Sequence, residues 1–100
     1  MNEKKRVRQR FRDAVFTRDK NRCVTCGWSK LPLSNSDLDA HHITDRHKMP
    51  NGGYVAENGI SLCPDCHMKA EHFHSTGTAL QGFSIEELYT RIGSSYEKAV

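Results

Sequence analysis

The sequence predicts one small α+β domain, and three observations support this class. The chain has 100 residues, of which 36% are hydrophobic and 27% charged. Helical patterns come before and after two short strand patterns, and the cysteines form two close pairs. A chain of this length supports one core and buries roughly 60% of the surface that its unfolded form exposes, so a further cross-link is expected. No apolar run is typical of a membrane span or signal peptide, so we expect a cytoplasmic protein with no membrane partner.

The N-terminal segment, residues 1–22, predicts a basic helical arm. It holds nine lysines and arginines against three acidic residues, whereas the other 78 residues hold six basic and nine acidic ones. Apolar residues at i, i+4, i+7 and i+8 form one stripe on this helix and leave charged side chains facing outward. Such a face either binds phosphate or only keeps the protein soluble. The stripe is Val7, Phe11, Ala14 and Val15, and the expected nucleic-acid contacts are Lys4, Lys5, Arg6, Arg10 and Arg12.

Two C-x2-C pairs, Cys23 with Cys26 and Cys63 with Cys66, are separated by 36 residues. Thiols stay reduced in the cytosol, and four thiolates suit a tetrahedral Zn(II) ion. Gly27 follows the first pair and permits the sharp turn of a zinc knuckle. We therefore expect a structural zinc site. A redox pair of the thioredoxin kind needs a βαβ setting that is not visible here, and two disulfides are the other alternative.

The segment around and between the cysteine pairs predicts two short strands joined by loops. Neighbouring side chains on a strand point to opposite faces, so His41 and His42 are expected to diverge. Turn-forming residues mark the loops. The strands are expected over residues 38–43 and 59–62, and the loops over 31–37 and 45–56.

Two more helices are predicted after the strands. Pro64 suits the first turn of one helix, which runs to about His74 and ends near Gly77. A Ser-x-x-Glu capping box begins the other, over residues 84–93, which we expect to serve packing. The last residues, 94–100, are expected to fray.

The chemistry-bearing residues follow one another in a specific order. Asp-Ala-His-His-Ile stands at 39–43, and Asn-Gly-Ile-Ser-Leu-Cys-Pro-Asp-Cys-His stands at 58–67. Together with both cysteine pairs, this order resembles the zinc-knuckle subclass of the His-Asn-His (HNH) endonuclease family. The resemblance implies a ββα-metal core, similar to a treble clef, over residues 23–75. In that core two antiparallel strands and a helix surround one catalytic divalent ion.

The resemblance also implies roles for single residues. His42 aligns with the family's general base. An imidazole suits that role because it is largely unprotonated near neutral pH. His41 and His67 align with ligands of the catalytic ion. Asn58 aligns with the family's central Asn, whose amide can tie the loop backbone beside the base. Because Asn58 precedes Gly59, a plain turn is the alternative there.

The third ligand of the catalytic ion stays open between a side chain and water. Glu71 shares the helix face of His67 whereas His72 is turned away, so Glu71 is the better side chain. His47 and His74 are expected to be surface or satisfied polar histidines and not ligands. We expect Mn(II) or Mg(II) to support turnover, with Mn(II) the better because imidazole softens the site.

The expected activity is hydrolysis of DNA phosphodiester bonds to 5′-phosphate and 3′-hydroxyl ends. A monomer with one site would nick one strand of double-stranded DNA, and a dimer could break both; no obligatory protein partner is evident. A nucleobase deaminase is excluded, since Leu62 precedes Cys63 and no histidine has a glutamate two residues later. The surviving alternative is a zinc-stapled nucleic-acid-binding module without catalysis.

Overall fold

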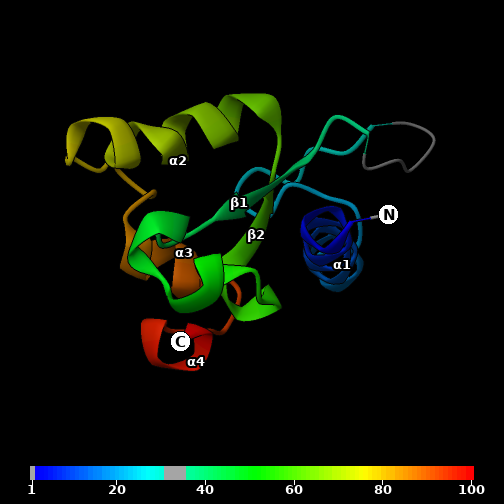
Figure 1. The fold of residues 1–100 in the computed structure, drawn as a ribbon. Helices are drawn as coiled ribbons and strands as arrows, with labels where there is room; N and C mark the ends of the chain where they lie inside the picture. Colours follow the sequence, from blue (N-terminus) through cyan, green and yellow to red (C-terminus); the bar gives the residue numbers. More distant parts are fainter. Residues whose placement is uncertain (1, 31–35) are drawn as a thin grey trace.

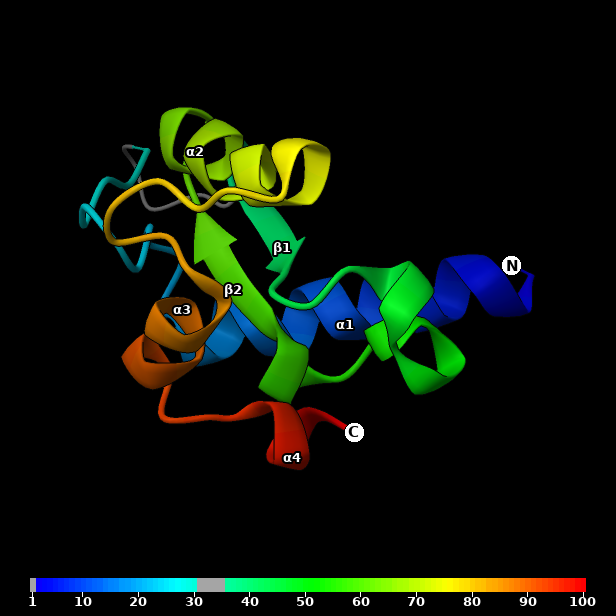
Figure 2. The same cartoon turned by 90° about the vertical axis from the view of Figure 1, so that its left-hand side faces the viewer.

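The computed structural model describes residues 2–30 and 36–100, so residues 31–35 of the expected first loop lie outside the described residues. Two antiparallel strands, β1 (Asp39–His42) and β2 (Gly59–Leu62), form the central sheet, in a register that pairs His41 with Ile60. Helix α1 (Glu3–Arg18) covers one face of this sheet and helix α2 (Pro64–Thr76) covers the other (Figures 1 and 2). The predicted α+β class is confirmed.

Helix α1 buries a different stripe from the predicted one. Phe11 and Val15 are buried as expected, but Ala14 is exposed and Phe16 is buried in its place. The guanidinium carbon of Arg12 lies 5.0 Å from the centroid of the Phe16 ring and covers it. The buried face is therefore turned toward Phe16, because a large aromatic ring gains more from burial than an alanine does.

The backbone of β2 lies directly against α1. A side chain at Gly59 would place its Cβ 2.8 Å from the ring of Phe11 and closer still to Val15, so only glycine fits. At the end of the helix, Arg18 donates hydrogen bonds to the carbonyl oxygens of Ala56 (2.8 Å) and Gly59 (2.7 Å). These contacts fix α1 relative to the sheet.

Three short 3-10 turns connect the strands. They are η1 (Arg46–Lys48), η2 (Pro50–Gly53) and η3 (Ala56–Asn58). Left-handed backbone at Asn51 and Gly52, with φ of 53° and 78°, reverses the chain inside η2. The returning strand then begins at Gly59, as the sequence predicts.

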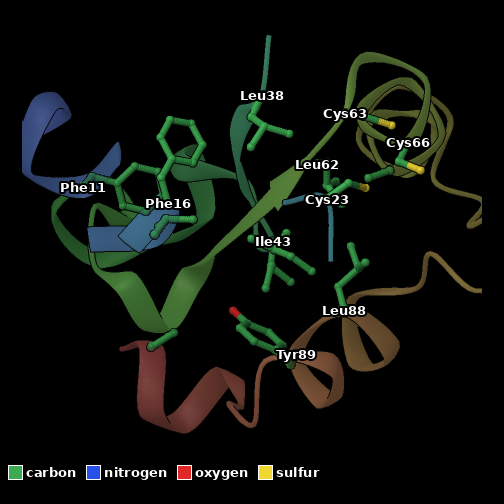
Figure 3. Packing of buried hydrophobic residues seen from close by; sticks show 14 of the residues in the cluster. Phe11, Phe16, Cys23, Leu38, Ile43, Leu62, Cys63, Cys66, Leu88 and Tyr89 are labelled. Atoms are coloured by element: carbon green, nitrogen blue, oxygen red, sulfur yellow. The ribbon is translucent and has the colours of Figure 1, made fainter. Parts of the chain in front are cut away.

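Helices α3 (Ile85–Arg91) and α4 (Tyr96–Ala99) close the remaining side of the core (Figures 2 and 3). The predicted capping box is present, since Ser84 accepts from the Glu87 amide and the Glu87 carboxylate accepts from the Ser84 amide. The expected fraying of 94–100 is wrong. Ser94 donates to the carbonyl oxygen of Glu57 (2.8 Å), and Ala99 is buried, so the C-terminal turn is part of the packed fold.

The core includes the buried face of α1, the sheet and α3, and it reaches the cysteines at the start of α2 (Figure 3). Its largest fully buried apolar side chains are Leu38, Ile43, Ile60, Leu62 and Leu88. None of the helices in the described part of the chain has the length and apolar character that a membrane crossing needs.

Candidate functional site

The four cysteine side chains converge on one point beside α2. Their Sγ atoms all lie within 4.8 Å of one another, and those of Cys26 and Cys63 are 3.7 Å apart. Sulfurs bound to a tetrahedral zinc ion at 2.3 Å would be about 3.8 Å apart. All four thiols are free, so the disulfide alternative does not apply. The cluster fits a structural zinc site, as the sequence predicts.

Local backbone structure positions these thiols. The Gly27 amide donates to the carbonyl oxygen of Cys23 (2.8 Å), and Gly27 takes the left-handed φ of 80° that the knuckle turn requires. Cys63 and Cys66 flank Pro64 at the first turn of α2. Burial raises the pKa of Cys66 to about 12, so the thiol needs a cation to ionise. Zinc would supply that charge and thereby stabilise the fold.

A second cluster lies between β1 and α2. His41 extends from β1, and His67, Glu71 and His74 follow one face of α2 at i, i+4 and i+7. The Glu71 Oε1 atom is 3.2 Å from His41 Nδ1 and 3.3 Å from His67 Nε2. One ligand atom from each of His41, Glu71 and His74 lies within 4.8 Å of the others. These three side chains can therefore hold a metal ion.

The environment of His41 fits a cation. The residue is 2% exposed, and neither ring nitrogen has a hydrogen-bond partner among the described residues, because Glu71 is close but poorly aligned. Burial, reinforced by His67 and His74, lowers the pKa of His41 to about 3, so the ring is neutral and offers a lone pair. A buried nitrogen without a partner is costly, and coordination of a divalent ion would satisfy it.

His74 is half-buried and hydrogen-bonded, which fits the expected surface or satisfied polar histidine, but it also lies in the candidate metal cluster. Its Nε2 lies 3.1 Å from the backbone oxygen of His42, which can only accept, so Nε2 carries the proton and Nδ1 is free to bind a metal. Its ring stacks on that of His41 with centroids 5.2 Å apart. The sequence signal that points to His74 is its i+7 spacing from His67, which puts both residues on one face of α2.

His67 lies beside the cluster but has a second partner. Its Nδ1 is 3.1 Å from Oδ2 of Asp39, on β1, while its Nε2 faces Glu71. The predicted ligands His41 and His67 are thus neighbours, with ring centroids 5.2 Å apart. His72 faces away, next to Met68 and Lys69, as predicted.

His42 lies on the opposite face of β1 from His41, as alternation on a strand predicts. Its ring stacks on Phe11, with centroids 4.6 Å apart, and meets the Tyr54 ring edge-on at 4.7 Å. Burial and the charge of Arg46 lower the pKa of His42 to about 4. The ring is therefore neutral at pH 7 and able to accept a proton.

One cavity joins the two histidine environments. It has a volume of about 340 Å³ and contains His42 on one wall and the α2 side chains Glu71 and His74 on another. Asp45, Arg46 and His47 complete its lining. A phosphodiester bound here would lie between a neutral imidazole and the candidate metal ligands.

Asn58 is fully buried and does not line this cavity. Its amide nitrogen donates to the carbonyl oxygens of Thr44 (3.1 Å) and Gly53 (3.3 Å). Its oxygen accepts from the Thr44 amide (3.0 Å) and the Tyr89 hydroxyl (2.7 Å). The side chain is thus placed to fix the loop after β1 and not to touch a substrate. Tyr89 and Thr44 carried no sequence signal for this network, since neither belongs to a motif.

The basic residues of α1 do not all face the cavities. Lys4 lines a second cavity, whereas Arg6 is 4.0 Å from Glu3 and Arg12 lies over Phe16. Arg10 is exposed on the face of α1 opposite the sheet, as is Arg6. Arg8, which was not among the expected nucleic-acid contacts, lines the same cavity as Lys4.

A family model described as HNH endonuclease matches residues 23–73, just over half of the chain. This chain belongs to the HNH endonuclease family. The match includes both cysteine pairs, both strands and α2 as far as Phe73, so the HNH protein carries the family's ββα-metal core. Members of this family are generally nucleases that act on DNA, which indicates a nuclease-type or nucleic-acid-binding function for this chain. Neither a search of curated proteins nor a search of solved structures found a match.

Proposed function

We propose that this HNH protein is a metal-dependent DNA endonuclease that cuts one strand of duplex DNA per event as a monomer, leaving 5′-phosphate and 3′-hydroxyl ends. The observation that carries the proposal is the shared cavity. It contains His42 together with Glu71 and His74, so one phosphodiester could meet a proton acceptor and a metal site at once.

His42 is the proposed general base. Its low pKa keeps the ring unprotonated at neutral pH, and the contacts with Phe11 and Tyr54 hold its orientation. Its Nε2 is buried, so a water that enters the cavity would give its proton to Nδ1. Asn58 is the proposed positioning residue, because it ties the backbone of Thr44 two residues after His42.

The proposed ligands of the catalytic ion are His41 and Glu71 with His74, and His67 stays a ligand candidate through its contact with Glu71. When bound, Mg(II) or Mn(II) supplies positive charge for the scissile phosphate and the leaving 3′ oxygen. A donor set rich in imidazole favours Mn(II) over Mg(II). The free thiols of the zinc cluster support a reducing compartment, such as the cytoplasm, as the place of action.

A plasmid assay tests this proposal. Supercoiled plasmid is incubated with the zinc-loaded protein and Mn(II), Mg(II) or no added ion, and the products are separated on an agarose gel. We expect relaxed circles that require the ion, little linear product, and no reaction with His42→Ala. His72→Ala is the matched control, because His72 faces away from both histidine environments. Supercoiled DNA that survives every ion but shifts on a native gel would instead identify a binding module.

A further inference from the structure

A second cavity lies between α1 and the turns η1 and η2, beside the proposed active site. It has a volume of about 470 Å³, and its walls include Lys4 and Arg8 from α1 together with Arg46, His47 and Tyr54 from the connection between the strands. Residues far apart in the sequence thus bring three permanent positive charges to one hollow. The family match begins at residue 23 and does not include the α1 contribution.

Two guanidinium groups lie near one neutral oxygen here. Arg46 Nη1 donates to the Tyr54 hydroxyl at 3.3 Å, and Arg8, which lines the same cavity, is close enough to help lower the pKa of that hydroxyl. In the described part of the chain neither arginine forms an ion pair with a carboxylate, although the acid Glu3 lines the cavity. By contrast, Arg18 forms an ion pair with the carboxylate of Asp19 at 2.7 Å. Two unpaired cations held together are stabilised by an anion, and a guanidinium matches phosphate geometry.

The two cavities have a common wall. Arg46 and His47 line both the cavity with Tyr54 and the cavity with His42. The Tyr54 ring also touches His42 edge-on at 4.7 Å. A single polyanionic strand could therefore occupy both cavities, with one of two successive phosphates in each cavity.

We propose that Arg8 and Arg46, with Lys4, form a subsite for a backbone phosphate of DNA next to the phosphate that is cut. Tyr54 is the positioning residue that holds the two guanidinium groups apart and in place. The position of the subsite relative to the cut rests on the proposed nuclease function, but the binding itself does not. The subsite shares Lys4 with the sequence expectation, which also names Lys5, Arg6, Arg10 and Arg12 but does not include Arg8 or Arg46.

Binding without cleavage tests the subsite. A fluorescein-labelled DNA duplex is titrated with zinc-loaded protein, with no added Mn(II) or Mg(II), and anisotropy is measured at several salt concentrations. Arg8→Gln and Arg46→Gln are each expected to weaken binding about tenfold and to reduce the slope of log K against log salt by about 1. Arg91→Gln, an exposed arginine on α3, is the matched control and should bind like the wild type. Circular dichroism and zinc content check that each variant is folded.

The outcomes separate this inference from the nuclease proposal. Unchanged binding by Arg8→Gln and Arg46→Gln in a protein that still nicks plasmid would overturn the subsite alone. Equal losses in Arg6→Gln and Arg10→Gln would also overturn it, since the general charge of α1 would then set the affinity. A protein that never cuts, but whose binding falls specifically with Arg8 and Arg46, would overturn the nuclease proposal and retain the phosphate site.

Discussion

His41 and His42 are adjacent in β1, yet their rings lie on opposite faces of the sheet. His41 is buried against α2, where Glu71 and His74 offer further metal ligands. His42 stacks on Phe11 of α1. One strand thus connects the candidate metal site to the candidate base, and a different helix supports each of them.

Replacing the base should separate cleavage from folding. His42→Ala removes the proposed proton acceptor, and we expect cleavage to fall about 100- to 10,000-fold. Zinc content and DNA affinity should stay near the wild-type values, because His42 belongs to neither the cysteine cluster nor the phosphate subsite. Plasmid nicking, metal analysis and anisotropy measure the three quantities. A variant that fails to fold would contradict the separation of the two sites.

Substitutions on α2 distinguish the candidate metal ligands. Glu71→Gln and His74→Ala should raise the Mn(II) concentration for half-maximal nicking about 10- to 100-fold, since each removes one donor. The same titration with His67→Ala shows whether His67 or His74 completes the site. His72→Ala should match the wild type. If only His67→Ala changed the metal requirement, the set of His41, Glu71 and His74 would be wrong.

The cysteine cluster should control stability. Cys23→Ser removes a buried ligand, and we expect loss of bound zinc and a melting temperature lower by about 10 °C or more. Metal analysis and a thermal melt followed by circular dichroism measure both. Lys30→Gln, an exposed change just after the knuckle, should leave both values unchanged. Full stability without zinc would show that the cluster is not a metal cross-link.

Loss of the Asn58 amide should destabilise the loop after β1. Asn58→Ala leaves the buried Thr44 amide and the Tyr89 hydroxyl without their common acceptor, at a cost of about 2–4 kcal/mol in the free energy of unfolding. Tyr89→Phe removes a hydroxyl that donates to Asn58 and also hydrogen-bonds to the Thr44 hydroxyl (2.7 Å), and it should cost less, about 1–2 kcal/mol. Urea unfolding monitored by fluorescence measures both values. Equal effects of the two changes would argue against Asn58 as the centre of the network.

Acid should weaken the fold through His41. Its pKa is about 3 in the folded protein against 6.5 for an ordinary histidine, so the unfolded chain binds more protons between these pH values. Stability therefore rises with pH across this range and is lost as the pH falls below 6.5, by about 1 kcal/mol per pH unit. Urea unfolding at pH 7 and 5.5, without added Mn(II) or Mg(II), should show this loss. His41→Gln should show a smaller one.

The ends of several helices and strands are predictable from short sequence motifs. The second strand is observed at the predicted residues, and Pro64 and Gly77 mark the two ends of α2 as expected. The capping box at Ser84 likewise predicts where α3 begins. These signals are local because each depends on the backbone preferences of one or two residues.

The remaining features depend on tertiary contacts. Phe16 replaces Ala14 in the buried face of α1 because of how the helix meets its surroundings, which the stripe pattern alone does not specify. His74 joins His41 only because α2 crosses β1 at that point. Arg8 and Arg46 are 38 positions apart, and no motif connects them. Pairing of distant segments sets these contacts.

The close fit of Gly59 against α1 has an evolutionary consequence. A gene rearrangement that transferred residues 23–73 alone would carry the cysteines and the candidate ligands His41 and Glu71, but it would lack His74 and leave His42 without the ring of Phe11 on which it stacks. Positions 11, 15 and 59 should therefore vary together among relatives, with a larger residue at 59 accompanied by a smaller one on the helix. The inherited unit would then be the core together with its N-terminal helix.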